Sequence, residues 1–140
     1  MIRYLFALIL MGGALVPAAR AETLDELQLP AEELHIRAGI VILAKIYQSL
    51  AMVQDQATAQ AAVPTLVQLT RELQVWGSAV ANLPPLSEGA KATYEARYHP
   101  PIRKLNDHLR AQGERLAASD YFGCKDLSAA LISLYVSVQQ

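Results

Sequence analysis

The chain has 140 residues, of which 53% are hydrophobic and 18% are charged, and its formal net charge is −1 at pH 7. This length supports one domain, and the hydrophobic content excludes an intrinsically disordered tail. The near-neutral charge argues against nucleic acid binding through phosphate contacts, and the single cysteine excludes an internal disulfide and any cysteine-based zinc or iron–sulfur site.

Residues 1–21 have the features of a cleaved secretory signal peptide. Arg3 provides a positive start, residues 5–16 are apolar, and Ala-Arg-Ala at 19–21 fits an A-x-A cleavage pattern. An apolar run of about a dozen residues is short for a bilayer-spanning helix, which needs about 20. We therefore expect a periplasmic or extracellular protein that begins at Glu22 and has no stable membrane insertion. The alternative is a protein anchored by an uncleaved N-terminal segment.

The remaining chain has an uneven charge distribution. Removing Arg3 and Arg20 leaves 10 of the 12 basic residues against all 13 acidic ones. Residues 22–33 contain five acidic residues and no basic one, whereas residues 97–115 contain five basic residues against two acidic ones. We interpret the two segments as solvated faces that attract each other within a bundle. The alternative is a weak site for an anionic ligand or a lipid headgroup on the basic segment.

Residues 31–54 are predicted to form the first helix. Pro30 suits a first helical position, and Glu32 and Glu33 complement the positive end of the helix dipole while facing solvent. The main apolar stripe recurs at spacings of three and four: Ile36, Ile40, Leu43, Tyr47 and Leu50. Further apolar residues widen this surface, so the helix is expected either to be central in a bundle or to face a partner protein. These candidate partner-facing residues are Val41, Ile42, Ile46 and Val53.

Residues 55–64 are expected to turn the chain through a short helical piece. Pro64 is predicted to open the next helix rather than to lie within one, because a proline ring clashes with the carbonyl four residues earlier. That second helix is predicted over residues 64–83, since Pro84 and Pro85 follow. A heptad-like seam runs along it and places the only tryptophan in the core: Leu66, Leu69, Leu73, Trp76, Val80 and Leu83.

Ser87 is predicted to cap the third helix. The Pro-Pro pair at 100–101 is expected to kink or split it, with one piece ending near Tyr98 and a second running over about residues 101–118. The apolar stripe of this segment consists of Tyr94, Tyr98, Ile102, Leu105, Leu109 and Leu116.

Residues 119–125 are predicted to form a loop, after which Asp126 can cap a last helix. One face of that helix would carry Leu127, Leu131, Leu134 and Val138. Residues 132–138 also alternate with period two, so a strand is the alternative, but a lone strand would have no sheet to join.

These segments predict an all-α fold for a single domain over residues 22–140. The expected architecture is an antiparallel up-down helical bundle with three long helices and a shorter C-terminal helix. Short connections favour antiparallel neighbours in such bundles.

A resemblance rests on the stretch Asp55-Gln-Ala-Thr-Ala-Gln-Ala-Ala-Val-Pro-Thr-Leu66. A Leu-Pro-Pro-Leu-Ser break follows at 83–87, and Tyr98-His99-Pro100 leads into the third helical segment. These elements resemble a family of small exported bacterial helical-bundle proteins with a D-x-A-[TS]-A-x-A-A-x-P-x-L hairpin motif. The resemblance covers about residues 31–118, and it implies a helical hairpin or bundle without assigning an activity.

The sequence lacks the common catalytic and phosphate-binding motifs, so no catalytic residue is predicted. Glu95 and His99 lie four residues apart and could share a helix face, with His35 and His108 as the other histidines. A metal site needs three or four converging ligands. We interpret the histidines as ordinary surface or boundary residues and predict no metal site and no cofactor.

The bundle interior provides an alternative function as a site for a small ligand or for non-covalent haem. The axial ligands of haem would be Met52 with His99 or His108, although a methionine on an apolar helix is more typical of core filling. Three tyrosines could line a pocket but are more typical of core edges with a solvated hydroxyl: Tyr94, Tyr98 and Tyr121.

Cys124 is a candidate intermolecular thiol, because its compartment is expected to be oxidising. The alternative is a buried and inert thiol, although the flanking Tyr121-Phe122-Gly123 indicates partial exposure. Taken together, the sequence favours a non-enzymatic structural or protein-interaction module. Its partner would be another protein or a second copy of the chain, and not a nucleic acid.

Overall fold

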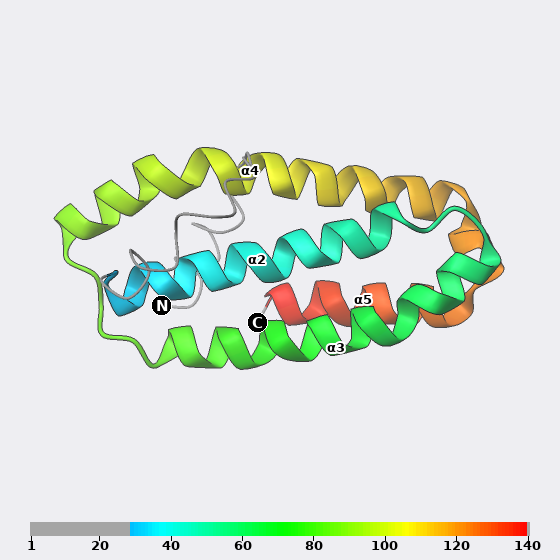
Figure 1. Ribbon diagram of the computed structural model, residues 1–140, viewed down its shortest axis with the longest axis horizontal. Coiled ribbons are helices and arrows are strands. Elements are labelled where there is room, and N and C mark those ends of the chain that lie inside the picture. The colour runs from blue at the N-terminus through cyan, green and yellow to red at the C-terminus, as the bar shows by residue number, and fades with distance from the viewer. Residues whose placement is uncertain (1–28, 140) are drawn as a thin grey trace.

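The computed structural model describes residues 29–139 as four α-helices and one short turn, with no strand among these residues (Figure 1). The helices are α2 (Ala31–Ala51), α3 (Gln56–Ala81), α4 (Glu88–Ala118) and α5 (Lys125–Gln139), and the short turn is η2 (Asp120–Gly123). The all-α prediction is confirmed at this level, including a helix rather than a strand over residues 132–138. The predicted signal peptide at 1–21 lies outside the described residues.

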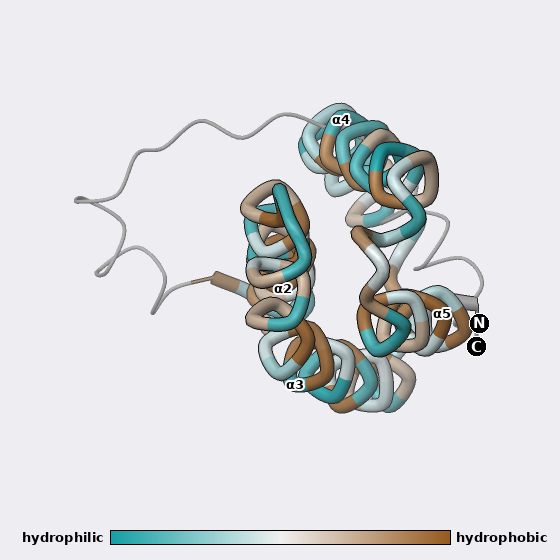
Figure 2. The backbone as a smooth tube through the Cα atoms, turned by 90° about the vertical axis from the view of Figure 1, so that its right-hand side faces the viewer, coloured by the Kyte–Doolittle hydropathy of each residue, from teal (hydrophilic) through white to brown (hydrophobic). Residues whose placement is uncertain are grey.

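The helices form an arc rather than a closed ring (Figure 2). The main contacts join α2 to α3, α2 to α4, and α3 to α5. In Figure 1 the chain passes left to right along α2 and α4, and right to left along α3 and α5. Helix α2 therefore lies between α3 and α4, while α4 and α5 form the two ends of the arc.

The core consists of the apolar stripes that face inward along the four helices. Ile36, Ile46, Leu66, Leu73, Ile102, Leu116 and Leu127 are the largest side chains with almost no exposed surface. Trp76 is 5% exposed, which confirms its predicted place in the core. Its indole nitrogen Nε1 donates a hydrogen bond of 2.7 Å to the backbone oxygen of His35, so the ring is held against α2.

The prediction that Pro64 opens the second helix is wrong, because α3 begins eight residues earlier at Gln56. The Asp55 carboxylate accepts from the backbone nitrogen of Thr58 at 2.8 Å, and the Thr58 hydroxyl accepts from the Asp55 backbone nitrogen at 3.0 Å. This capping box satisfies the first free backbone groups of the helix. The carbonyl that Pro64 leaves without an intrahelical partner belongs to Gln60, and both residues are exposed to water.

The expected split at residues 100–101 is also wrong, since α4 is continuous from Glu88 to Ala118. Buried side chains lie on both sides of the proline pair, with Tyr98 before it and Ile102 after it. A proline within a helix costs about 3 kcal/mol, an amount that the burial of two such side chains can offset. The predicted Ser87 cap is confirmed, because the Ser87 hydroxyl accepts from the Ala90 backbone nitrogen at 3.2 Å.

Helix α2 ends at Ala51, three residues before its predicted end, and Arg115 of α4 binds its C-terminal carbonyls. The guanidinium donates to the Val53 oxygen at 2.8 Å and to the Leu50 oxygen at 2.9 Å. Positive charge at this end complements the helix dipole. Met52 is 73% exposed at this position, so the expectation that it fills the core is wrong.

The predicted loop after α4 contains a left-handed turn. Asp120, Tyr121, Phe122 and Gly123 have φ values of 47°, 52°, 54° and 72°. A left-handed conformation costs about 1–2 kcal/mol for each residue other than glycine. The half-buried rings of Tyr121 and Phe122 pack against the core, and this contact stabilises the turn that leads into α5.

Candidate functional site

The predicted partner-facing surface of the first helix is mostly buried. Ile42, Ile46 and Val53 are 9%, 1% and 0% exposed, so the prediction is wrong for these three residues. They are buried because α2 has helices on two sides, α3 and α4. Val41 is 52% exposed and is the only one of the four that remains available on the surface.

Cys124 is buried, with 5% of its surface exposed, at the junction between η2 and α5. The expectation of partial exposure is therefore wrong. A buried thiol cannot reach a second chain without local unfolding, so the structure favours the alternative of an inert core residue.

A buried carboxylate connects α2 to α4, and the sequence had suggested that it faces solvent. Glu33 is 4% exposed and accepts hydrogen bonds from the hydroxyl of Tyr98 and from Nη1 of Arg97, the latter at 2.8 Å. Nη2 of Arg37 lies 3.6 Å from the same carboxylate oxygen, and Nε of Arg37 donates to the Tyr98 hydroxyl at 3.2 Å. Glu33, Arg37, Arg97 and Tyr98 therefore form one network.

The protonation of Glu33 reflects two opposing effects. Burial alone would raise the pKa of its carboxyl, but the hydrogen bonds from Tyr98 and Arg97 and the positive charges of Arg97 and Arg37 more than offset burial and lower this pKa. Glu33 is thus held in its ionised form. Its position three residues before Ile36, in line with the apolar stripe, is the sequence signal that could have indicated burial.

Two of the three predicted pocket tyrosines lie in the core, and none lines the groove described next. Tyr94 and Tyr98 are each 8% exposed, with ring centroids 6.4 Å apart, and Tyr121 is half-buried. Burial and the nearby negative charges of Glu33 and Glu32 raise the pKa of the Tyr94 hydroxyl. Tyr94 and Tyr98 are therefore core residues, and the Tyr98 hydroxyl is bonded to Glu33 rather than solvated as the alternative interpretation expected; only Tyr121 lies at a core edge.

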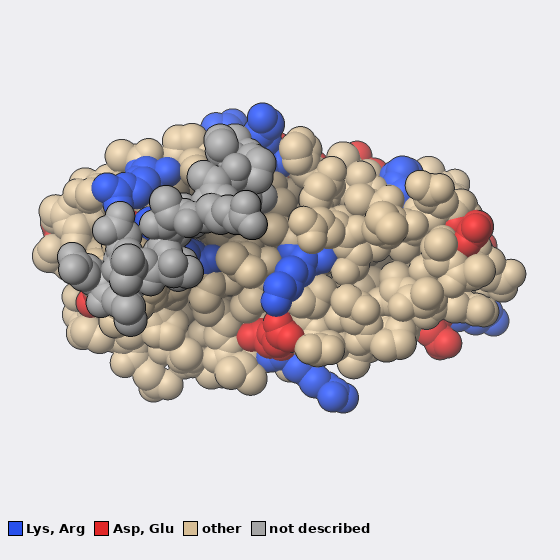
Figure 3. Space-filling model, in the orientation of Figure 1, with Lys and Arg blue, Asp and Glu red and all other residues tan. Residues whose placement is uncertain are grey.

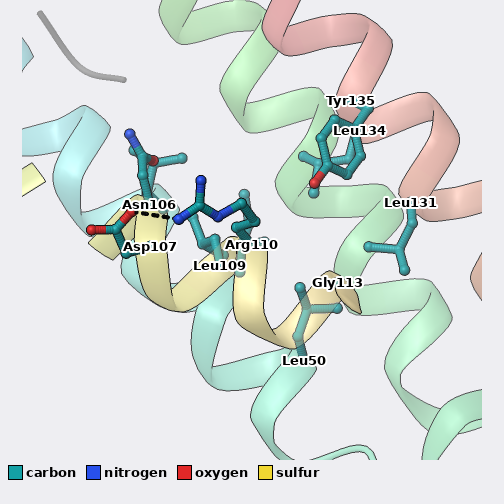
Figure 4. Close-up of a pocket in the computed structure, with 11 residues that line it drawn as sticks. Leu50, Asn106, Asp107, Leu109, Arg110, Gly113, Leu131, Leu134 and Tyr135 are labelled. Atoms are coloured by element: carbon teal, nitrogen blue, oxygen red, sulfur yellow. Dashed lines mark hydrogen bonds and ion pairs between the residues drawn. The ribbon is translucent and has the colours of Figure 1, made fainter. Parts of the chain in front are cut away.

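A largely apolar groove of about 300 Å³ lies between α4 and α5, where the arc of helices is open, with its floor on α2 (Figure 4). Helix α2 contributes Leu43, Ile46 and Leu50; α4 contributes Asn106, Asp107, Leu109, Arg110 and Gly113; α5 contributes Leu131, Leu134 and Tyr135. Its volume falls at the lower end of the range for small-molecule sites. The apolar stripes were predicted, but the opening between two of the helices was not.

The polar atoms of the groove gather at its rim. Asn106, Asp107 and Arg110 lie along one side of α4, and Arg110 Nη2 lies 3.2 Å from the Asp107 carboxylate (Figure 4). The side chains of Arg110 and Asp107 are 70% and 55% exposed, so their ion pair is in contact with water. Tyr135 lies on the opposite wall and is 57% exposed. Basic side chains also lie along the upper part of the face in Figure 3, where α4 runs.

The outer face of α5 is a second exposed apolar feature. Ile132 and Val136 lie one turn apart and are 62% and 50% exposed. No charged residue follows Asp126 in the part of the helix that the structure describes. The solvent side of an amphipathic helix normally carries charged side chains, so this face is unusual for a free surface.

The histidines do not assemble into a metal site. Within residues 29–139, no group of three or more His, Cys, Asp or Glu side chains could hold a metal ion. His108 is exposed and its ring lies 5.5 Å from that of Tyr47, while Met52 is exposed at the end of α2. Among the described residues, the groove lining includes none of the axial haem ligands predicted from the sequence, Met52, His99 and His108.

None of the helices in the described part of the chain is both long and apolar enough to cross a membrane. No family model, curated protein or solved structure matches this chain.

Proposed function

We propose that this chain is an exported, non-enzymatic interaction module that docks a second copy of itself through the outer face of α5. The domain would be an antiparallel up-down bundle over residues 22–140. The exposed pair Ile132 and Val136 on a helix face without charge is the observation that carries the proposal. Contiguous exposed apolar surface is typical of interaction sites.

The absence of charge on this face favours a second copy as the partner. A two-fold interface brings the same patch together from both chains, so any charge near the axis would oppose itself. The α5 face between residues 127 and 137 avoids that repulsion. This surface replaces the one predicted on the first helix, which is largely buried.

A non-enzymatic role is supported by the state of the buried carboxylate in the described part of the chain. Glu33 is 4% exposed and already accepts hydrogen bonds from Tyr98 and Arg97. A general base needs a free carboxylate or imidazole within reach of a substrate. Glu33 does not offer one in this arrangement.

The double variant Ile132→Glu/Val136→Glu is expected to convert a dimer of the wild-type chain into a monomer. Four carboxylates would face each other across the two-fold interface, where like charges are strongly unfavourable. Size-exclusion chromatography with light scattering over a concentration series measures this change. Val75→Glu is the matched control, because Val75 is 70% exposed on α3, and it should remain dimeric. A wild-type chain that is monomeric throughout, or a dimer that survives the double variant, would contradict the proposal.

Export is expected to remove residues 1–21. N-terminal sequencing of the protein recovered from the periplasm or the medium should then begin at Glu22. A mature chain that still begins at Met1 would instead favour the uncleaved anchor.

A second candidate function is the binding of a small apolar ligand in the groove between α4 and α5. The groove itself favours it, since its walls are mainly leucine and isoleucine and its polar groups are few and confined to the rim. The haem alternative has no support from the described lining residues, because they do not include Met52, His99 or His108, the predicted axial ligands. The residues of the groove and those of the α5 outer face do not overlap, so the two candidates can be tested separately.

A further inference from the structure

We infer that the groove between α4 and α5 binds a free, single-chain amphiphile with an anionic head group, its alkyl chain in the groove and its head at the α4 rim. This inference rests on the second candidate function, ligand binding in the groove, and adds the chemical class of the ligand. It is independent of self-association through Ile132 and Val136.

The interior of the groove fits an alkyl chain. Its floor and walls are branched aliphatic side chains from three helices: Leu43, Ile46, Leu50, Leu109, Leu131 and Leu134. All of these except the half-buried Leu109 are less than 10% exposed, so the surface is already shaped by packing. The backbone polar groups of the three walls are used within helices, and a ligand finds no hydrogen-bonding partner at depth. Such a surface favours a flexible hydrocarbon chain.

The volume of the groove suits a single hydrocarbon chain. An α-helix with its side chains is about 10–12 Å across, so a groove of about 300 Å³ could take up side chains of a partner helix but not the helix itself. One extended hydrocarbon chain needs only a narrow channel. Gly113 helps to keep this channel open, because a Cβ atom placed there would lie 3.6 Å from the hydroxyl oxygen of Tyr135.

The rim supplies hydrogen-bond donors to a head group. The guanidinium of Arg110 and the hydroxyl of Tyr135 lie at the groove, and Asp107 is the only acidic residue among the described lining residues. The ion pair between Arg110 and Asp107 is solvent-exposed, and such pairs are weak enough for Arg110 to exchange partners.

Arg103 precedes Arg110 by seven residues, or two helical turns, and is itself exposed on the same side of α4. Asp107 and Glu114 also lie on this side, whereas Arg97 and Arg115 contact α2 or the residues that follow it. The preference for an anionic head over a neutral one is therefore assigned to Arg110 itself, the basic residue in the groove lining.

Titrations with octanoate and with 1-octanol test the contributions of the alkyl chain and of the head group separately. Both probes are kept below the concentrations at which they aggregate. The amide resonance of Gly113 in a proton–nitrogen NMR spectrum reports occupancy, because Gly113 lines the groove. We expect both probes to shift this resonance and octanoate to bind about tenfold more tightly, the effect of one charge-assisted hydrogen bond.

Three variants assign the interactions. Arg110→Gln is expected to lower the affinity for octanoate to that for 1-octanol. Arg71→Gln makes the same charge change at an exposed site on α3 and should leave the tenfold preference for octanoate intact. Leu109→Trp, which places a larger side chain on the half-buried wall, should prevent binding of both probes. Circular dichroism checks that each variant remains folded.

The outcomes separate the two claims. If neither probe binds the wild-type chain, both ligand binding in the groove and the head-group assignment fail. If both bind equally, or if Arg110→Gln leaves the preference unchanged, only the anionic head group at Arg110 is overturned. The protein is expected not to sediment with phosphatidylglycerol vesicles. Sedimentation that depends on Arg110 would overturn the assignment to a free ligand and place the head group in a bilayer.

Discussion

Replacing Trp76 with alanine is expected to lower the free energy of unfolding by about 3–5 kcal/mol. The indole is 5% exposed between α3 and α2, and its removal leaves a cavity that the helices cannot fill without moving. The backbone oxygen of His35 also loses the hydrogen bond from Nε1. Urea unfolding followed by circular dichroism measures the change, and a loss of less than about 1 kcal/mol would contradict a core role for this ring.

Substitution of Gly39 tests one contact of the Trp76 ring, the one with α2. A Cβ atom at this position would lie 2.6 Å from Cζ2 of Trp76, closer than non-bonded carbon atoms approach. Gly39→Ala is therefore expected to destabilise the protein by about 1–3 kcal/mol, despite the better helix propensity of alanine. In the Trp76→Ala background the clash disappears, and the same substitution should be neutral or stabilising.

Gly89→Ala is the matched control, because nothing lies within 4 Å of a Cβ atom at this helical position in α4. It should be neutral or stabilise the protein by up to about 1 kcal/mol. Additive effects of Gly39→Ala and Trp76→Ala in a double-mutant cycle would show that the two residues do not touch.

Glu33→Ala is expected to lower the free energy of unfolding by about 2–3 kcal/mol. The variant leaves the buried hydroxyl of Tyr98 without its acceptor and removes the charge that Arg97 and Arg37 contact. The effect is smaller than for a fully buried ion pair, because Arg97 is 56% exposed and can be solvated. Glu114→Ala, at an exposed position of α4, should change stability by no more than about 0.5 kcal/mol.

The pH dependence of stability provides a separate measurement of the same network. The folded state lowers the pKa of Glu33 from its ordinary value of 4.5, so the unfolded state binds this proton more tightly. The contribution of Glu33 is fully present above that ordinary value and is lost as the pH falls through the lowered pKa. Urea unfolding between pH 7 and pH 3 should therefore show a smaller acid-induced loss for Glu33→Gln than for the wild-type chain. An identical loss in both would contradict the lowered pKa.

Local sequence features predicted the helices well where the relevant interactions are themselves local. The hydroxyl of Ser87 caps the helix that follows it, as expected, and the seam residues Leu66, Leu69 and Leu73 are buried. Each of these predictions depends on spacing within about one turn of the chain. The predictions at the prolines failed because the interactions that decide them are not local. The Pro100–Pro101 pair is tolerated within α4 because Tyr98 and Ile102 are buried on either side of it. Pro64 is tolerated within α3 because the Gln60 carbonyl that it leaves unpaired belongs to a residue exposed to water.

The candidate sites were much less predictable. The first helix carries more apolar residues than one stripe needs, and this excess is compatible with either a partner surface or a central position. The structure resolves the choice for Ile42, Ile46 and Val53, which are covered by the neighbouring helices. Glu33 similarly has the composition of a solvent-facing first turn, but Tyr98 and Arg97, more than 60 residues away, enclose it.

The amino-acid sequence alone determined that this chain is helical and which side chains form most of its core, because periodicity and capping act between residues that are neighbours along the chain. Only the tertiary structure decided which helices lie side by side. The groove between α4 and α5 and the exposed outer face of α5 both follow from that choice. They depend on where the arc of helices is left open, and this geometry is set by contacts between residues distant in sequence.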